Sequence, residues 1–357
     1  MKIVVLSDNK PGHYKQSLGI VQHLTDYSIE WQNIRFRNKW RDNLIRIFIC
    51  IFGGISLPTP LIKSILQWCL HSTDYKSLII KNNVDIVLST GSSLAAINLL
   101  LGKIYLAKTI TCRRPSPIGI RKFDLAILPM FSWHHGKKNK NVCKTIGVPN
   151  SISPEVLNEK RYDYAKDLKL DDRKCIGILI GGQDKSEKIT LDDTIKLYET
   201  IESVVKQQNV LILLTTSRRT PPEVTDYLKL KLEAKDWCPL FIDPNTPSNI
   251  PDHYETILAL SDLLIVTGDS FSMVCEAASS GRQVLVLEMT LKTIRKPTRY
   301  KVYQSMADQS TINLCNINDL SQQINLVLTL DNPINILHDT ADAVKAIQKL
   351  MVSSSNN

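Results

Sequence analysis

The sequence lacks the patterns that hold structural metals or disulfide frameworks. Its eight cysteines are scattered, with no CxxC pair and no Cys/His cluster at zinc spacing. An Asp-x-Asp pair that could bind a divalent cation is also absent. We therefore expect no bound metal, and thiols that stay reduced as they do in a cytosolic compartment.

Long apolar runs and a targeting segment are missing as well. The most apolar stretch, Leu44–Leu57, is shorter than the roughly 20 residues that span a bilayer, and Gly53-Gly54 interrupts it. A strand pattern begins at Lys2, which leaves no room for a signal or transit peptide. These features predict a cytoplasmic protein.

Acidic residues are scarce in the first part of the chain. Residues 1–150 hold 21 Lys/Arg and 7 Asp/Glu, a net charge of +14, whereas residues 151–357 hold 23 and 28, a net charge of −5. This asymmetry predicts an anionic partner for the first part, such as a phosphorylated or acidic substrate or a membrane surface. Nucleic acid is disfavoured, because aromatic residues are only 6% and no nucleic-acid-binding motif accompanies the charge.

The apolar stretch Leu44–Leu57 (LIRIFICIFGGISL) stands among basic residues. Arg46 lies within it, and Arg41 and Lys63 flank it. An interfacial patch attracted to anionic lipid headgroups fits this pattern, and so does a buried helix-loop-helix of the core. The sequence leaves both interpretations open.

Short aliphatic runs alternate with helical patterns, as a parallel sheet requires. The runs are residues 3–6, 84–88, 125–128, 176–180, 210–214, 263–266 and 284–287. We predict an α/β fold with two Rossmann-like doubly wound domains. The Pro/Ser-rich segment 147–154 separates a basic N-terminal domain, residues 1–150, from a C-terminal domain, residues 151–352.

The end of the chain has two further patterns. A helical pattern at about 339–351 could pack back on the first domain. The Ser/Asn tail, residues 353–357, is expected to be disordered.

In doubly wound sheets, ligands bind beyond the carboxyl ends of the strands, so the loops there are candidate sites. The loop after the first strand, residues 7–16 (SDNKPGHYKQ), places His13 at the start of a helix. His13 and Asp8 are the candidate catalytic residues, with His13 as general base. A solvated loop histidine is the alternative. The candidate binding residues of this loop are Lys10, Gly12 and Gln16.

Three further turns combine small polar residues, glycines and arginines. Glycines let the backbone approach a ligand closely, and two guanidiniums at a strand end can bind a diphosphate bidentately. Plain surface turns are the alternative for each. The candidate substrate-binding residues of these turns are Thr90, Gly91, Ser92, Gly181, Gly182, Gln183, Thr216, Ser217, Arg218 and Arg219.

The segment 266–281 (VTGDSFSMVCEAASSG) predicts the end of a strand, a turn and a helix. Ser270 or Ser272 can cap this helix, whose positive end attracts a phosphate, and Glu276, about one and a half turns later, can accept bonds from ribose hydroxyls. An ordinary capped helix with a solvated glutamate is the alternative. The candidate substrate-binding residues here are Gly268, Asp269, Ser270, Ser272, Met273 and Glu276.

These five loops, taken in order, resemble those of the family named for the mitochondrial-fission protein ELM, whose bacterial members are often labelled as predicted nucleoside-diphosphate-sugar epimerases. The signatures are DNKPGHYKQ (8–16), STG (89–91), GG (181–182), TTSRRTP (215–221) and VTGDSFSMVCEAASSG (266–281). The last two together are the most specific. The family is in turn similar to GT-B glycosyltransferases, particularly the enzyme that adds N-acetylglucosamine to the lipid-linked peptidoglycan precursor.

The resemblance implies a GT-B architecture, in which two Rossmann-like domains face each other across a cleft. It implies that His13 lies in the acceptor domain and Glu276 near a ribose. The residues that it places near phosphates are Gly182, Arg218, Ser270 and Ser272.

Two positions depart from the family's pattern. Asn9 stands where a glycine is expected in the first loop, and Asp252-His253-Tyr254 stands where the family tends to have Asn-Pro-Tyr. The second departure puts the contacts made just before the strand 263–266 in doubt.

The favoured function is metal-independent glycosyl transfer from a nucleoside-diphosphate sugar, without a further cofactor. His13 would take the proton of the acceptor hydroxyl, while Arg218, the serines and the helix end would stabilise the leaving diphosphate. The basic first domain favours a lipid-linked or lipopolysaccharide-type acceptor, with the protein peripheral on the inner face of an anionic membrane.

Two other functions stay open. A nucleotide-sugar epimerase or hydrolase could use Asp8, His13 and Asp184 as acid and base groups. A non-catalytic adaptor could keep the fold and recruit partners through its basic face. An adaptor, however, has no need of Arg218 and Arg219 beside Ser270.

Overall fold

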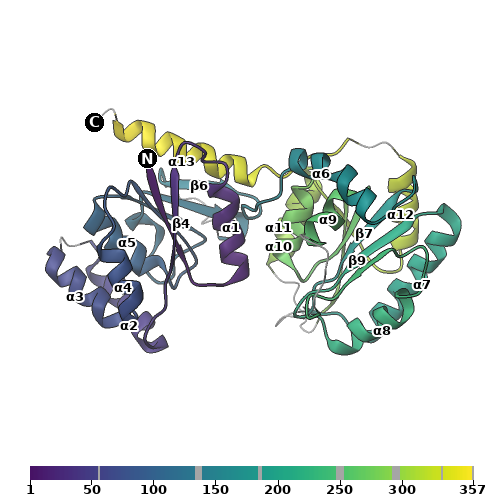
Figure 1. The fold of residues 1–357 in the computed structure, drawn as a ribbon, viewed down its shortest axis with the longest axis horizontal. Helices are drawn as coiled ribbons and strands as arrows, with labels where there is room; N and C mark the ends of the chain where they lie inside the picture. The colour runs from purple at the N-terminus through teal and green to yellow at the C-terminus, as the bar shows by residue number, and fades with distance from the viewer. Residues whose placement is uncertain are drawn as a thin grey trace. The chain divides into compact units, whose positions relative to one another are not determined.

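The computed structural model describes residues 1–54, 57–132, 139–183, 187–246, 253–291, 298–330 and 333–355. The chain divides into two compact units (Figure 1). Unit 1 comprises Met1–Ser151 and His338–Asn357, and unit 2 comprises Ile152–Leu337. Within the described ranges, no helix is long and apolar enough to cross a membrane.

Unit 1 is built on a six-stranded sheet in which every neighbouring pair is parallel, in the order β2-β1-β3-β4-β5-β6. The strands are β1 (Lys2–Ser7), β2 (Ser28–Asn33), β3 (Ile86–Thr90), β4 (Lys108–Cys112), β5 (Leu125–Pro129) and β6 (Val142–Thr145). The helices are α1 (Pro11–Val21), α2 (Lys39–Phe52), α3 (Thr59–Cys69), α4 (Ser72–Ile79), α5 (Ala95–Tyr105), η1 (Ile120–Lys122), η2 (Met130–Ser132) and α13 (Asp339–Ser355).

Helices cover both faces of this sheet. Side chains alternate along β1, so Ile3 and Val5 pack in the core with α1 and α13, whereas Val4 and Leu6 pack in the core with α2 to α5. Figure 1 shows α1 and α5 on opposite sides of the strands. Burial on both faces explains why the central strands read as continuous aliphatic runs.

The aliphatic runs do not predict β4, whose sequence is KTITC. Its threonines are buried and β-branched, which suits a strand despite their hydroxyl groups. The amide of Asn98 on α5 donates to the Ile110 carbonyl at 2.8 Å and to the Ser89 hydroxyl at 2.8 Å, and so ties the helix to β3 and β4. A central strand of the sheet is therefore partly polar in sequence.

Unit 2 repeats this architecture with the strand order β10-β9-β7-β11-β12-β14, again with parallel neighbours throughout. The strands are β7 (Cys175–Leu179), β9 (Leu211–Thr215), β10 (Leu240–Ile242), β11 (Leu263–Thr267), β12 (Gln283–Leu287) and β14 (Asn313–Cys315), and a separate antiparallel pair is formed by β8 (Glu187–Lys188) and β13 (Thr290–Leu291). The helices are α6 (Pro154–Asp167), α7 (Leu191–Gln208), α8 (Pro222–Leu232), α9 (His253–Leu260), α10 (Phe271–Ala278), α11 (Arg299–Asp308) and α12 (Leu320–Thr329).

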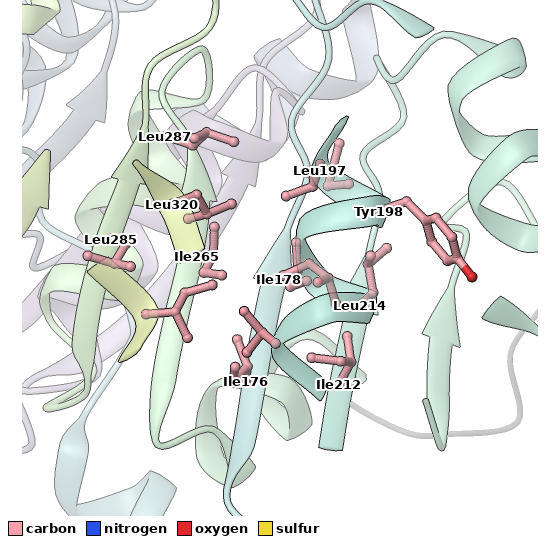
Figure 2. Packing of buried hydrophobic residues seen from close by; sticks show 14 of the residues in the cluster. Ile176, Ile178, Leu197, Tyr198, Ile212, Leu214, Ile265, Leu285, Leu287 and Leu320 are labelled. Atoms are coloured by element: carbon pink, nitrogen blue, oxygen red, sulfur yellow. The ribbon is translucent and has the colours of Figure 1, made fainter. Parts of the chain in front are cut away.

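Aliphatic side chains from the central strands form the core of unit 2. Figure 2 shows Ile178 of β7, Leu214 of β9 and Ile265 of β11 pointing toward Leu197 of α7 and Leu320 of α12. Because these strands sit side by side, their carboxyl ends lie along one edge of the sheet, where a ligand site is expected.

The last helix, α13, belongs to unit 1, although the range predicted for the C-terminal domain included it. Asp339 accepts the backbone N–H of Ile146 at 2.8 Å and of Gly147 at 2.6 Å, and Ala343 and Ile347 are buried against the sheet. The helix runs through Ser355 and so includes the first residues of the tail 353–357, for which disorder is predicted. Residues 356–357 lie outside the described part of the chain.

Candidate functional site

Asp8 and His13 form a hydrogen-bonded pair at the carboxyl end of β1. Nδ1 of His13 lies 3.0 Å from Oδ1 and 3.1 Å from Oδ2 of Asp8. His13 stands in the first turn of α1, so the short connection between strand and helix brings the imidazole back to the carboxylate. A carboxylate at Nδ1 fixes the ring and leaves Nε2 as the basic nitrogen.

The Asp8 carboxylate is held in its ionised form. Burial raises the pKa of Asp8, but hydrogen bonds and charge from His13 and Lys10 outweigh burial and leave this pKa well below its usual range. Nζ of Lys10 donates to Asp8 at 2.6 Å, and the Ser93 hydroxyl also donates to Asp8, at 3.1 Å. The geometry therefore gives Asp8 the role of orienting His13, and Lys10 the role of a partner of Asp8.

Gly91 makes room for the His13 ring. A Cβ atom at Gly91 would overlap Cε1 of His13 and would lie 2.9 Å from Nδ1 and 3.0 Å from Nε2. Gly91 also has φ of +92°, which disfavours any residue with a Cβ. The predicted turn after β3 thus packs directly against the predicted base.

The remaining predicted residues of unit 1 have different surroundings. The Thr90 hydroxyl is buried at 2.8 Å from the Ser17 hydroxyl, and the Ser92 hydroxyl donates to the Arg114 carbonyl at 3.1 Å. Gln16 is buried, and its Oε1 has no hydrogen-bond partner among the residues that the structure describes. Gly12 lies half-buried in the first turn of α1.

In unit 2, the turns after β7, β9 and β11 are bonded to one another. The N–H of Gly181 donates to the Thr267 hydroxyl at 2.7 Å, and the N–H of Gly182 donates to Asp269 at 2.7 Å. The Ser217 hydroxyl donates to the Gly181 carbonyl at 2.7 Å. The structure therefore brings three predicted segments into one network at the edge of the sheet.

The two glycines after β7 are needed by this network itself. A Cβ at Gly181 would overlap the Asp269 carboxylate, and one at Gly182 would overlap the backbone of Arg219. Asp269 is buried and accepts the N–H of Gly182, so it links the turn after β11 to the turn after β7. Other residues of the same unit fill the space beside both glycines, so a ligand is not needed to explain why glycine stands at these two positions.

The adjacent arginines after β9 differ in their surroundings. Arg219 lies 3.6 Å from Asp269, and its Nη1 donates to the Gln183 carbonyl at 3.4 Å. Arg218 is exposed and has neither a hydrogen-bond nor an ion-pair partner among the described residues. Thr216 is buried beside them. Arg218 is thus the guanidinium of this pair that is available to a ligand.

The helix α10 begins as predicted, at Phe271 after Ser270, but no side chain caps it. Ser270 is the N-cap residue and makes no capping hydrogen bond with its side chain. Ser272 and Met273 are half-buried in the first turn. The first turn of α10 therefore keeps backbone N–H groups that its own cap does not satisfy, as anion sites at helix ends require.

Glu276 is buried, which contradicts the alternative of a solvated glutamate. Its side chain is 3% exposed. Burial and then the neighbouring Glu276 carboxylate raise the pKa of Tyr254 well above its usual range, which places the phenol beside this carboxylate. Tyr254 belongs to the segment that departs from the family's pattern, and Asp252 of that segment lies outside the described residues. Asp184, a predicted acid or base group, also lies outside them.

Side chains of α11 also hold the turn at Gly268, and the sequence does not predict these contacts. The Tyr303 hydroxyl donates to the Gly268 carbonyl at 2.9 Å, and Nε of Arg299 donates to the same atom at 3.0 Å. Arg299 also pairs with the buried Glu187, which accepts from the Tyr300 hydroxyl at 2.7 Å. These residues come from β8 and α11. Both elements are separated in the sequence from the turn after β11, so no local sequence pattern predicts the contact.

Two parallel doubly wound sheets with their polar turns at the carboxyl edges define a GT-B-like α/β protein. The chain belongs to the family described as Mitochondrial fission ELM1, whose model matches residues 11–349. A curated relative, Uncharacterized protein RP120 of Rickettsia prowazekii (strain Madrid E), is 23% identical over 323 residues, 80% of this chain and 83% of that protein. The family and the fold class predicted from the sequence are confirmed.

Solved structures of low sequence identity share the fold. A putative UDP-N-acetylglucosamine 2-epimerase from Listeria monocytogenes has a TM-score of 0.60 at 14% identity, covering 100% of this chain and 97% of that chain. The UDP-GlcNAc 2-epimerase from Methanocaldococcus jannaschii has a TM-score of 0.59 at 13% identity, covering 99% and 100%. The same enzyme in complex with UDP-GlcNAc and UDP has a TM-score of 0.52 at 13% identity, covering 99% and 100%.

Proposed function

We propose that this protein is a metal-independent glycosyltransferase that uses a nucleoside-diphosphate sugar. Unit 1 supplies the base, His13, which removes the proton of the acceptor hydroxyl as that oxygen attacks the anomeric carbon. Unit 2 binds the nucleoside diphosphate, which leaves with the electron pair of the glycosidic bond. No cofactor enters the reaction.

The observation that carries this proposal is the fixed His13 ring. Asp8 holds Nδ1 at 3.0 Å, and Gly91 leaves the space that the ring fills. A ring held in this way exposes one basic nitrogen at the strand ends, where substrates of doubly wound domains bind. The nearest carboxylate, Asp8, is committed to orienting the ring.

The donor site is proposed at the turns of unit 2. Arg218 and backbone N–H groups in the first turn of α10 would hold the diphosphate, and the serines Ser270 and Ser272 would add hydroxyl donors. Glu276, with Tyr254 beside it, would accept from the ribose. Support for a uridine nucleotide comes from the similar fold of an epimerase that was solved with UDP-GlcNAc and UDP.

The acceptor is proposed to be an amphiphile, reached from an anionic membrane face. On α2, Ile45 and Ile49 are buried, but Ile47 and Ile51 are exposed by 50% and 65%. A cavity of about 300 Å³ lies between α2 and α3, and its lining is apolar. The cavity is lined by Leu44, Ile45, Phe48, Ile65 and Trp68. Helix α2 therefore carries both buried and exposed apolar side chains, so it is neither wholly core nor wholly surface.

Basic groups border this apolar face. Arg41 lies over the rings of Trp40 and Trp68, with its guanidinium carbon 5.2 and 4.9 Å from the ring centroids. Such groups at the rim of exposed apolar side chains favour anionic lipid headgroups. Arg35 is held by Asp74 at 2.8 Å and so contributes less than its position in the sequence suggests.

A thermal-shift screen with UDP, GDP, CMP and ADP tests the donor site. One nucleoside diphosphate should stabilise the protein, by roughly 2.7 kcal/mol at 100 times its dissociation constant. Glu276→Gln should lose most of this stabilisation, whereas His13→Gln in unit 1 should keep it. Stabilisation by none of the four, with the protein folded, would refute the proposal.

A nucleotide-sugar epimerase would pass the same screen, so product formation separates the two functions. A glycosyltransferase releases the nucleoside diphosphate only when lipid extract supplies an acceptor. An epimerase converts the sugar nucleotide into its epimer without any extract. Conversion of this kind would replace the proposed reaction by epimerisation.

A further inference from the structure

Arg113 occupies the first position after β4, at the edge of the sheet that carries His13. The central strands β3 and β4 run in parallel with Thr90 opposite Cys112, so Arg113 follows β4 where Gly91 follows β3. The N–H of Gly91 donates to the Cys112 carbonyl at 3.0 Å, and the N–H of Arg113 donates to the Ile127 carbonyl at 2.9 Å. Arg113 is therefore fixed by its backbone beside the turn that packs on His13.

Among the residues that the structure describes, none pairs with the guanidinium of Arg113. It makes neither a hydrogen bond nor an ion pair with any of the residues that the structure describes, although the residue is only half exposed. Burial lowers the pKa of Arg113, and no carboxylate offsets this effect. An unpaired, partly desolvated cation is unfavourable in a folded protein unless an anion completes it.

The loop that starts at Arg113 contacts both the turn after β3, which packs against His13, and helix α2. The Ser92 hydroxyl donates to the Arg114 carbonyl at 3.1 Å and accepts the N–H of Ser116 at 3.3 Å. From α2, the Cys50 thiol donates to the Pro117 carbonyl at 3.4 Å. A group bound at Arg113 would lie between the turn that supports the base and the helix that carries the exposed apolar side chains.

We propose that Arg113 binds an anionic group of the acceptor, a phosphate or a carboxylate. A guanidinium presents two parallel N–H donors to such an oxyanion and fixes its orientation. This inference rests on the proposed function, because it gives the acceptor of His13 a charge. The acceptor class is thus an anionic amphiphile, whose charge is read by Arg113 and whose apolar part meets α2.

The test measures binding of inorganic phosphate, dodecyl phosphate and acetate to the full-length protein by calorimetry at constant ionic strength. Wild type should bind at least one of them, and phosphate against acetate separates the two oxyanions. Arg113→Gln should weaken binding by at least tenfold, whereas Arg113→Lys should retain part of it. Arg114→Gln removes the same charge from the exposed neighbour and should leave binding within twofold.

Each outcome bears on the inference. Equal losses of anion binding in R113Q and R114Q would show that only net charge matters, and would overturn the inference. Unchanged anion binding in R113Q would overturn it too. Absence of binding in wild type would also overturn it. Phosphate bound through Arg113 in a protein that binds no nucleoside diphosphate would uphold the anion site and refute the proposed transferase.

Discussion

Nδ1 of His13 lies 3.0 Å from Oδ1 of Asp8, and the same ring packs against Gly91, a glycine with φ of +92°. His13 and Lys10 keep the Asp8 carboxylate ionised. The His13 ring can occupy its position because Gly91 has no side chain there.

Gly91→Ala should impair activity much more than it impairs folding. Its Cβ would overlap the His13 ring, so the ring must move away from Asp8. Gly119→Ala is the matched control, because Gly119 has φ of +84° and open space around its Cβ position. Both variants place a Cβ at a positive φ, and Gly119, with ψ of 156°, lies in a region that is nearly restricted to glycine, so each carries backbone strain on the order of 1–3 kcal/mol. Equal activity losses in both would show that the ring position is unimportant.

Arg218 and Arg219 should separate binding from stability. Arg218→Gln should weaken nucleotide binding about tenfold or more without changing the melting temperature, because it removes an unpaired charge that could bond a phosphate. Arg219→Gln should lower the melting temperature slightly, because it removes the partner of Asp269 and Gln183. Calorimetric titration with UDP and thermal unfolding measure the two effects. The reverse pattern would assign the phosphate to Arg219.

Asp339 should make stability depend on pH. Burial raises the pKa of Asp339 to about 6, although the N–H groups of Ile146 and Gly147 act in the other direction. The folded state favours the protonated carboxyl, so this stabilisation is present below the ordinary pKa of 3.8 and is lost as the pH rises through about 6. The loss is about 3 kcal/mol.

Asp339→Asn should flatten this part of the pH profile of the free energy of unfolding, measured by urea denaturation. Asp342→Asn, on an exposed position of the same helix, should reduce the slope only a little, because burial raises the pKa of Asp339 more than the charge of Asp342 does. A slope in D339N equal to that of wild type would rule out Asp339 as its source.

Membrane binding should depend on the exposed apolar face of α2. Ile47→Ser with Ile51→Ser should weaken flotation with anionic vesicles, because both side chains are exposed and can insert among lipids. Ile80→Ser is the control, since Ile80 is 76% exposed in unit 1 but lies on no part of α2 or α3. Wild type should bind anionic vesicles at low salt and release them at high salt. Equal flotation with neutral vesicles would contradict an electrostatic contribution.

The sequence predicts the parts of this protein that local patterns encode. Aliphatic runs identify β1, β3, β7, β9 and β11, and the turns after them contain the polar residues that the structure brings together. It does not predict β4, because threonines fill a buried strand, and it therefore does not place Arg113 at a strand end. Contacts between distant segments, such as Asp269 with Gly182, leave no periodic signal.

Burial of polar groups is the other feature that sequence patterns miss. The pattern around Glu276 leaves a ribose contact and a solvated position open, and it does not show that Tyr254 from α9 lies beside this carboxylate. Asp339 reads as an ordinary first-turn acid, but the backbone of 146–147 occupies both its oxygens. In both cases the partner is far away in the chain, so only the folded structure identifies it.

The most direct test of the central claim is nucleoside-diphosphate release from UDP-sugars in EDTA, with and without lipid extract. The account predicts release that requires the extract and persists without divalent metal, because Arg218 and backbone N–H groups meet the phosphate charge. His13→Gln should lower the rate by about 10²- to 10⁴-fold while UDP binding is kept. Complete loss in EDTA that Mg²⁺ restores, or an unchanged rate in H13Q, would contradict it.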